Sequence, residues 1–166
     1  IQPYPFTTAG GSARVTNVTL CNSYNGIGLE LFNACVVENV HGTVLNRGIV
    51  APESFEFSWM HDVHFSNEYW QRAASASGGN PFTAGQRAAL DRFTQERLTG
   101  LEIGRIDGLA IYRYSADHAK TPILVRKNER VDQHPVFGFG GVAAEFRGRR
   151  EEHGWDPWYY GMHYAN

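Results

Sequence analysis

Two histidines, His41 and His64, stand at equivalent places in a repeating pattern, each two residues after an asparagine or aspartate. Imidazole gains and loses a proton near neutral pH, so a pair on one face could exchange protons with a substrate, bind an anionic sugar or share a metal ion. No third ligand follows at a recognisable spacing, and we therefore expect no metal and no cofactor. Two surface histidines without a role are the alternative interpretation.

A carboxylate stands beside aromatic rings in the segment that follows His64. Glu68 immediately precedes Tyr69 and Trp70. The apolar faces of sugar rings stack on aromatic side chains while acids accept hydrogen bonds from the hydroxyls, so this composition is typical of a sugar subsite. It is equally typical of the end of an ordinary strand.

Charged side chains gather again after a strand-like segment that carries Arg113 and Tyr114. Asp117, His118 and Lys120 follow it closely. An elimination on an acidic polysaccharide needs a cation to neutralise the uronate carboxylate and a base to remove the neighbouring proton. Arg113, Lys120 and His118 could supply both. A solvated loop without a catalytic role is the alternative.

Two types of reaction therefore remain open. A glycosidase would need paired carboxylates, for which Glu68 and Asp117 are candidates, whereas a lyase would rely on Arg113 or Lys120. The candidate catalytic residues are Glu68, Asp117, Arg113 and His64. The candidate substrate-binding residues are His41, Trp70, Tyr114, Lys120, Trp155 and Trp158.

The densest aromatic stretch, residues 155–160, contains Trp155 and Trp158 near the end of the sequence. This stretch could line a glycan groove. Because the open end of a stack of strands exposes unpaired backbone groups, we favour a cap over that end.

The elements that would position these residues follow from a repeat. Asn17, Asn39 and Asp62 recur at steps of 22 and 23 residues, each is followed by a valine, and Asp107 stands about two further steps along the chain. Periods of roughly 20 to 50 residues are typical of stacked arrays. Asn and Asp tolerate a left-handed backbone, so we expect this column at a bend. Its two carboxylates are then structural rather than an acid and base pair.

A second phrase, Gly26-Ile27 and Gly48-Ile49, keeps the same step. In a stack of strands, equivalent residues lie above one another at about 4.8 Å, so the valines that follow the bend column should point inward. The predicted outward columns are Thr19, His41, His64 and Leu109, and in parallel Ser23, Leu45, Glu68 and Arg113.

We therefore expect an all-β fold, a single-stranded right-handed parallel β-helix or solenoid, with one external helix near 84–98. Thr83 and Gly100 supply the start and stop signals of that helix. The predicted organisation places rungs at 1–70, a loop and helix insertion at 71–100, further rungs at 101–128 and an irregular aromatic-rich cap at 129–166. We expect residues 1–166 to form either a single β-helix domain or the C-terminal part of a longer one. The sequence starts without Met or a signal peptide, which favours a mature, processed or excised piece.

The overall composition argues against several functions. A formal charge of −2, without runs of Lys or Arg, gives no strong field for nucleic acid. The apolar stretches are far shorter than the roughly 18 residues that span a membrane. The sequence has no phosphate-binding loop, hydrolase nucleophile elbow or metalloprotease histidine pair. Cys21 and Cys35 lie off the repeat, which favours two small apolar side chains over a disulfide.

Several phrases are distinctive enough to indicate a family. They are Pro3–Phe6 ahead of Val15–Leu20, Asn39–Thr43 with Arg47–Ile49, Asp62–Ser66 with Tyr69–Trp70, and Gly104–Asp107. Together these phrases, over roughly residues 3–115, resemble the pectate-lyase-like superfamily of right-handed parallel β-helices. The resemblance is to the group related to pectate-lyase-3 and family 55 glycoside hydrolase domains.

The resemblance implies a secreted, extracellular protein that acts on a polysaccharide as a glycoside hydrolase or a polysaccharide lyase. Some members are attachment or structural modules, so a non-catalytic glycan-binding or structural module, such as part of a phage fibre or surface protein, is the alternative. No member's catalytic set maps residue by residue onto this chain. The expected partner is a polysaccharide, with neither nucleic acid nor membrane. Open ends of the stack also favour a homo-oligomer or association with the rest of a longer chain.

Overall fold

The computed structural model describes residues 6–9, 11–30 and 34–125. Trp155, Trp158 and the expected cap at 129–166 lie outside the described residues. The elements in chain order are β1 (Phe6–Ala9), β2 (Ala13–Glu30), β3 (Cys35–Phe65), α1 (Glu68–Ala76), α2 (Ala84–Arg97), β4 (Thr99–Ala116) and β5 (Thr121–Val125).

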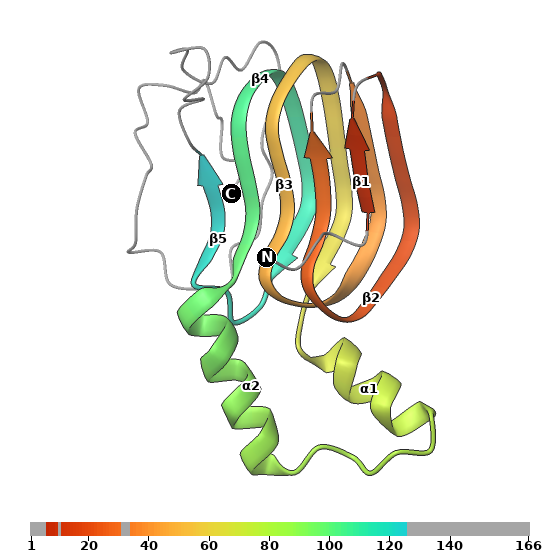
Figure 1. Cartoon of the computed structure of the whole chain (residues 1–166), viewed down its shortest axis with the longest axis vertical. Helices are drawn as coiled ribbons and strands as arrows, with labels where there is room; N and C mark the ends of the chain where they lie inside the picture. The colour runs from red at the N-terminus through yellow and green to blue at the C-terminus, as the bar shows by residue number, and fades with distance from the viewer. Residues whose placement is uncertain (1–5, 10, 31–33, 126–166) are drawn as a thin grey trace.

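The described strands form one five-stranded sheet with the order β1-β2-β3-β4-β5, and each neighbouring pair is parallel. This sheet curls into a half-barrel (Figure 1). The expected right-handed β-helix solenoid is therefore wrong, as is the expectation of one helix, because the described residues contain two. β2 has 18 residues and β3 has 31, far more than the usual 5 or 6, so these strands bend without ending. The bends that the repeat predicts as corners between sheets lie inside continuous strands.

The register between β2 and β3 confirms the repeat of 22 residues. Val18 is paired with Val40, and Ile27 with Ile49. β3 also curls far enough that its two halves lie side by side: the Ser66 amide donates a hydrogen bond of 2.8 Å to the Gly42 carbonyl. Residues one step apart within this one strand are therefore spatial neighbours.

The register between β3 and β4 differs from the prediction, because both helices are inserted between these strands. His61 is paired with Tyr112 and Val63 with Tyr114, which places Arg113 beside Asp62. The expected fourth member of the bend column, Asp107, is thus replaced by Arg113. The backbone of all four observed members is left-handed, with φ values of 58° at Asn17, 51° at Asn39, 55° at Asp62 and 51° at Arg113.

Side-chain contacts follow this bend column across the sheet. The Asn39 amide donates a hydrogen bond of 2.7 Å to Asn17 Oδ1. Arg113 donates through Nε and Nη2 to the two oxygens of Asp62, each at 2.5 Å. Asn and Asp adopt a left-handed backbone readily whereas arginine does so less readily. The paired hydrogen bonds to Asp62 favour the conformation at Arg113.

The core lies inside the curl. Val40 and Val63 are buried in a single apolar cluster, and Val18 packs against it partly buried, so the expected interior stack of these valines is confirmed. Gly48 lies at a close approach of successive turns, where a Cβ atom would overlap the Gly100 carbonyl oxygen. A Cβ atom at Gly26 would in turn overlap the Gly48 carbonyl oxygen. The glycine phrase in the sequence therefore marks a column where only hydrogen fits.

The two helices lie together at one end of the half-barrel, joined by residues 77–83 (Figure 1). α2 agrees with the predicted helix. Thr83 caps it, because its hydroxyl accepts from the Gln86 amide while the Gln86 side chain accepts from the Thr83 amide. α1 was not expected. Among the described residues, no helix has the length and apolar character needed to cross a membrane.

Candidate active site

The end of β3, the start of α1 and the end of β4 meet at one place and are held there by buried polar groups. Asn67 is buried between β3 and α1, and its amide donates to Asp91 Oδ1 at 2.9 Å and to Thr94 Oγ1 at 3.0 Å, both on α2. The Asp117 amide donates to the Phe65 carbonyl at 2.8 Å. These bonds fix the positions from which side chains project at the junction.

Thr43 makes the corresponding link from the first half of β3. Its buried hydroxyl donates to the Ser66 carbonyl at 2.7 Å and accepts from the Trp70 amide at 2.9 Å. One side chain therefore bonds both the strand end and the first turn of α1. Because buried hydrogen-bonding groups are costly to leave unpaired, this arrangement holds α1 in one position.

His64 lies at the centre of the junction and has a partner on each ring nitrogen. Its Nε2 is 3.1 Å from Asp117 Oδ2, and its Nδ1 is 3.0 Å from the Tyr69 hydroxyl. An ionised carboxylate only accepts hydrogen bonds, so Nε2 carries the hydrogen and donates to Asp117. Nδ1 of the neutral ring then accepts from the Tyr69 hydroxyl. The three residues form a chain from carboxylate through imidazole to phenol.

His41 completes the group. Its ring stacks on Tyr69 with centroids 5.6 Å apart and planes inclined by 11°, and it meets His64 edge to face at 6.5 Å. The predicted adjacency of His41 and His64 is therefore confirmed. We call His41, His64, Tyr69 and Asp117 the histidine–tyrosine cluster. Within the described part of the chain, His41 makes ring contacts but no side-chain hydrogen bond.

The electrostatic setting keeps Tyr69 protonated. Burial has the largest effect and raises the pKa of the Tyr69 phenol above the ordinary value of 10.0. The nearby positive charge of Arg72 lowers this pKa, whereas the negative charges of Asp117 and Glu68 raise it. The second oxygen of Asp117, Oδ1, is buried and has no hydrogen-bond partner among the described residues. His64 remains partly open to solvent, with 37% of its side chain exposed. The cluster thus combines a proton donor, an oriented imidazole and access from solvent.

Two of the predicted catalytic residues lie elsewhere. Arg113 is held by Asp62 at the bend. Glu68 lies near Tyr69 and raises its pKa, but its side chain is exposed on α1 and pairs with Arg72 at 2.5 Å. The predicted outward column that contained both is wrong, since α1 begins at Glu68 and Arg113 belongs to the bend column. Leu109, predicted outward, is buried.

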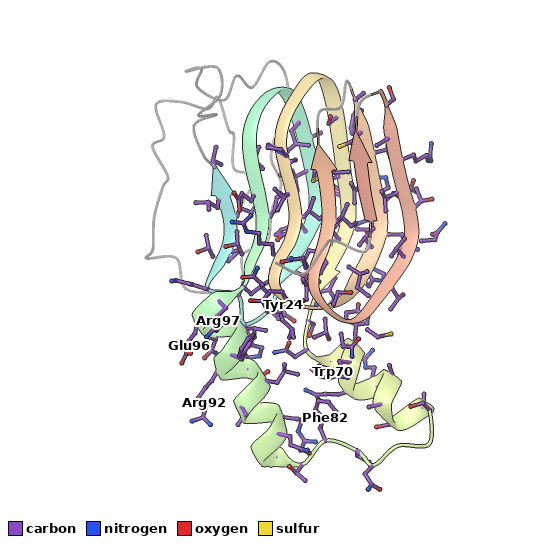
Figure 2. The ribbon with its side chains drawn as sticks, in the orientation of Figure 1. Tyr24, Trp70, Phe82, Arg92, Glu96 and Arg97 are labelled. Carbon is purple, nitrogen blue, oxygen red and sulfur yellow. The ribbon has the colours of Figure 1, made fainter. Side chains whose placement is uncertain are left out.

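The predicted binding residues are also dispersed. Trp70 contacts Phe82 edge to face at 5.3 Å in the region between α1 and α2 (Figure 2). Tyr114 is buried and its hydroxyl donates to the Pro122 carbonyl at 2.9 Å. Lys120 is exposed, and His118 is also exposed, with Nδ1 3.2 Å from Gln95 Nε2 on α2. Of the predicted site residues that are described, only His41, His64 and Asp117 come together.

Tyr69 is the member of the cluster that sequence reasoning missed. The sequence shows it merely as an aromatic neighbour of Glu68. Its direction depends on α1, which turns the chain immediately after the strand that carries His64. A histidine near a strand end followed five residues later by tyrosine in a first helical turn is the signal that would have found it.

Metal binding has no visible basis in this part of the structure. Across residues 6–9, 11–30 and 34–125, no group of three or more His, Cys, Asp or Glu side chains is arranged to hold an ion. Cys21 is exposed and Cys35 buried, both as free thiols. Burial raises the pKa of the Cys35 thiol to about 11, so it remains an apolar core group at neutral pH.

Comparisons with protein-family models, with curated proteins and with solved structures found no match for this chain. The resemblance to pectate-lyase-like proteins therefore stays a prediction from the sequence. The chemistry of the histidine–tyrosine cluster is the basis on which a function can be argued.

Proposed function

We propose that this chain is a carbohydrate-active protein that cleaves an acidic polysaccharide by β-elimination, as a polysaccharide lyase does, at the histidine–tyrosine cluster. One observation carries the proposal. A phenol bonded to an Asp-oriented imidazole lies stacked against a second imidazole, His41, whose ring nitrogens have no hydrogen-bond partner among the described residues. A proton donor and a proton acceptor thus stand side by side at a partly exposed place.

The reaction needs a base that takes a proton from the sugar and an acid that protonates the leaving oxygen. His41 removes the proton from the carbon next to the uronate carboxylate, and the electron pair of that bond forms a carbon–carbon double bond. The bond from the adjacent carbon to the glycosidic oxygen breaks with its electron pair. Tyr69 donates its phenolic proton to that oxygen. His41 then carries the proton that Tyr69 needs, so exchange through water restores both groups.

His64 and Asp117 act on Tyr69 rather than on the sugar. Asp117 holds His64 in the tautomer that presents Nδ1 to the phenol, and His64 fixes the direction of the Tyr69 hydroxyl. They are therefore positioning residues.

The substrate carboxylate needs a cation, and we assign that role to Arg72. Its guanidinium carbon lies 5.9 Å from the centre of the Tyr69 ring. Arg72 pairs with Glu68 across an exposed helix surface, where such ion pairs contribute little to stability. A uronate carboxylate can therefore replace Glu68 as its partner. A uronate is also the group whose neighbouring proton is acidic enough to remove.

The hydrolase alternative has less support in the described residues. Glycoside hydrolysis uses two carboxyl groups on either side of the bond. Asp117 is bonded to His64, and Glu68 is bonded to Arg72 on the exposed surface of α1. Neither arrangement resembles a free pair, whereas the phenol and the imidazoles match the requirements of elimination.

The full chain should be incubated with polygalacturonate, alginate and hyaluronan while the ultraviolet absorbance of the unsaturated product is followed. We expect turnover of at least one of them, and a loss of about 100-fold in kcat in Tyr69→Phe, which keeps the ring and removes the proton donor. The matched control is Tyr24→Phe, which removes a phenol on β2 that is not part of the cluster. Absence of unsaturated product from all three polymers, or full activity in Tyr69→Phe, contradicts the proposal. Binding without turnover would favour a glycan-binding module.

A further inference from the structure

The histidine–tyrosine cluster takes its members from β3, α1 and the segment after β4, and α2 is bonded beside two of these three. Asn67 immediately precedes α1, and its side-chain amide donates to Asp91 and Thr94 of α2. On the other side, the Lys120 amide, which follows β4, donates to the Thr94 carbonyl at 3.2 Å. Thr94 is the residue that the two connections have in common.

The Thr94 side chain is fully buried, and its hydroxyl both donates and accepts. The oxygen lies 3.2 Å from the Leu90 carbonyl and 3.1 Å from the Asp91 carbonyl, in the preceding turn of α2, and its single hydrogen is directed there. The same oxygen accepts from the Asn67 side chain at 3.0 Å. The hydroxyl thus joins α2 to the residue at which α1 begins.

The main-chain carbonyl of Thr94 accepts two hydrogen bonds. The Leu98 amide donates at 2.9 Å and ends the helix, and the Lys120 amide donates at 3.2 Å. A carbonyl oxygen has two lone pairs and accommodates both donors. Lys120 is three residues after Asp117, whose own amide donates to the Phe65 carbonyl. The segment that carries Asp117 is therefore held at one end by β3 and at the other by α2.

These connections are close enough to the cluster to control its geometry. Asn67 caps the start of α1, and Tyr69 lies in the first turn that follows. The Tyr69 hydroxyl reaches His64 Nδ1 at 3.0 Å. Hydrogen bonds weaken steeply as they lengthen and bend, so a displacement of about 1 Å at the start of α1 is enough to break this contact.

We propose that Thr94 is a positioning residue for the histidine–tyrosine cluster. Its hydroxyl fixes the Tyr69 side of His64 through Asn67, and its carbonyl fixes the Asp117 side through Lys120. A substitution of the side chain therefore changes the Tyr69 side alone. The consequence for turnover rests on the proposed elimination, whereas the consequence for the His64 ring does not.

The Tyr69 side is tested by nitrogen–proton NMR of the His64 ring in the full chain. Thr94→Val keeps the shape of the side chain and removes the hydroxyl, so we expect the tautomer equilibrium of His64 to shift about fivefold towards that of Tyr69→Phe, as for the loss of one hydrogen bond. The shift is partial because Thr43 still bonds the Trp70 amide in α1. Thr94→Ser, which keeps the hydroxyl, should retain the wild-type equilibrium.

The matched control for stability is Ile27→Val. Ile27 is buried in β2, and the loss of one methylene lowers stability without removing any hydrogen bond of the junction. This variant should unfold at a lower urea concentration than the wild type and give an unchanged His64 ring. A residue that merely stabilised the fold would behave in the same way at position 94.

The Asp117 side is tested in the wild type by amide hydrogen exchange. The Lys120 amide should exchange at least about 100-fold more slowly than in the unfolded chain, and Thr94→Val should exchange similarly because its carbonyl is unchanged. This measurement on the wild type does not require that any variant folds.

Turnover provides a third measurement. On any polymer that the wild type cleaves, Thr94→Val should lower kcat about tenfold with little change in KM, because Thr94 orients the acid and does not contact the sugar. If no polymer is cleaved, the proposed function fails, while the His64 measurement still decides the role of Thr94.

Three results would overturn the inference. The first is an unchanged His64 equilibrium in a folded Thr94→Val variant, and the second is the same shift in Thr94→Ser, because the hydroxyl would then not matter. The third is a wild-type Lys120 amide that exchanges as fast as in the unfolded chain. Circular dichroism of each variant establishes whether the fold is retained.

Discussion

The strand pairs β2–β3 and β3–β4 contain the same left-handed backbone bend, but different side chains form hydrogen bonds across it. At the first step, Asn17 and Asn39 have left-handed backbones and share one amide hydrogen bond. At the second, Asp62 and Arg113 have the same backbone but share a charged pair of hydrogen bonds. The bend is therefore a property of position in the curl, and different side-chain pairs satisfy it.

The two steps differ more in what the intervening chain contributes. Only residues 31–34 separate β2 from β3, whereas α1 and α2 lie between β3 and β4. Tyr69 comes from α1 and Asp117 from the end of β4, and both reach His64. The regular sheet supplies a rigid frame with histidines in neighbouring positions. The insertion supplies the additional groups that turn a pair of histidines into a candidate site.

The largest expected effect is on the free energy of unfolding, and it distinguishes the closely packed glycine column from the exposed first turn of α2. A Cβ atom at Gly48 would overlap the Gly100 carbonyl and lie 2.6 Å from the Phe65 ring. Gly48→Ala should therefore lower the free energy of unfolding by about 3 kcal/mol, the upper end of overpacking costs. At Gly85, in the first turn of α2, a Cβ atom meets only the Thr83 hydroxyl at 4.0 Å. Gly85→Ala should raise the free energy of unfolding by about 0.5 kcal/mol.

Urea unfolding of both variants beside the wild type measures this difference. Equal effects of Gly48→Ala and Gly85→Ala would contradict the close stacking of the glycine column. A large loss at Gly85 alone would mean that α2 is packed more tightly than the structure shows.

A smaller effect is expected where the insertion is attached to the sheet. Asn67→Ala removes a buried amide that bonds Asp91 and Thr94, so we expect a loss of about 2 kcal/mol in the free energy of unfolding. Asn17→Gly, which keeps a residue that tolerates the left-handed backbone, removes an exposed side-chain hydrogen bond of the ladder and should cost less than about 1 kcal/mol. Denaturant titration ranks the two. A ladder variant less stable than Asn67→Ala would reverse the comparison.

The smallest expected effect is on the stability of the fold at acid pH. Hydrogen bonds from Arg113 and then from His61 lower the pKa of Asp62 to about 2 from its ordinary 3.8. A carboxyl group with a lowered pKa in the folded state adds stability that is fully present above pH 3.8 and is lost as the pH falls towards 2. Asp62→Asn should therefore be less sensitive than the wild type to acid in this window. The exposed position keeps the difference small.

Thermal unfolding between about pH 5 and pH 2 measures that sensitivity. The matched variant is Asn39→Asp, which places a carboxylate in the other pair without an arginine partner. An identical acid response of the wild type and Asp62→Asn would show that the Arg113 pair does not stabilise the fold.

The sequence predicted the frame better than the site. The step of 22 residues, the left-handed bend column and the inward valines all follow from repeated neighbours such as Val18 and Val40, whose pairing the structure confirms. The capped start of α2 also followed from a local residue, Thr83. Local patterns of this kind need no knowledge of distant contacts.

The sequence predictions are wrong where contacts between residues far apart in the chain determine the structure. The insertion makes the offset between β3 and β4 longer than two repeats, so Arg113 and not Asp107 lies beside Asp62. The same offset places Asp117 beside His64, a pairing of residues 53 apart. α1 escaped prediction because it is short, and its position depends on Thr43 and Asn67. The curled half-barrel likewise depends on how long strands bend in space.

The central claim is that Asp117, His64 and Tyr69 form one hydrogen-bonded chain. The direct measurement is nitrogen–proton NMR of the imidazole rings in the full chain. We predict that His64 is held as the tautomer with hydrogen on Nε2, and that Asp117→Asn and Tyr69→Phe each remove this preference. A His64 ring that exchanges between tautomers as a solvated imidazole does, and that neither substitution alters, would contradict the account.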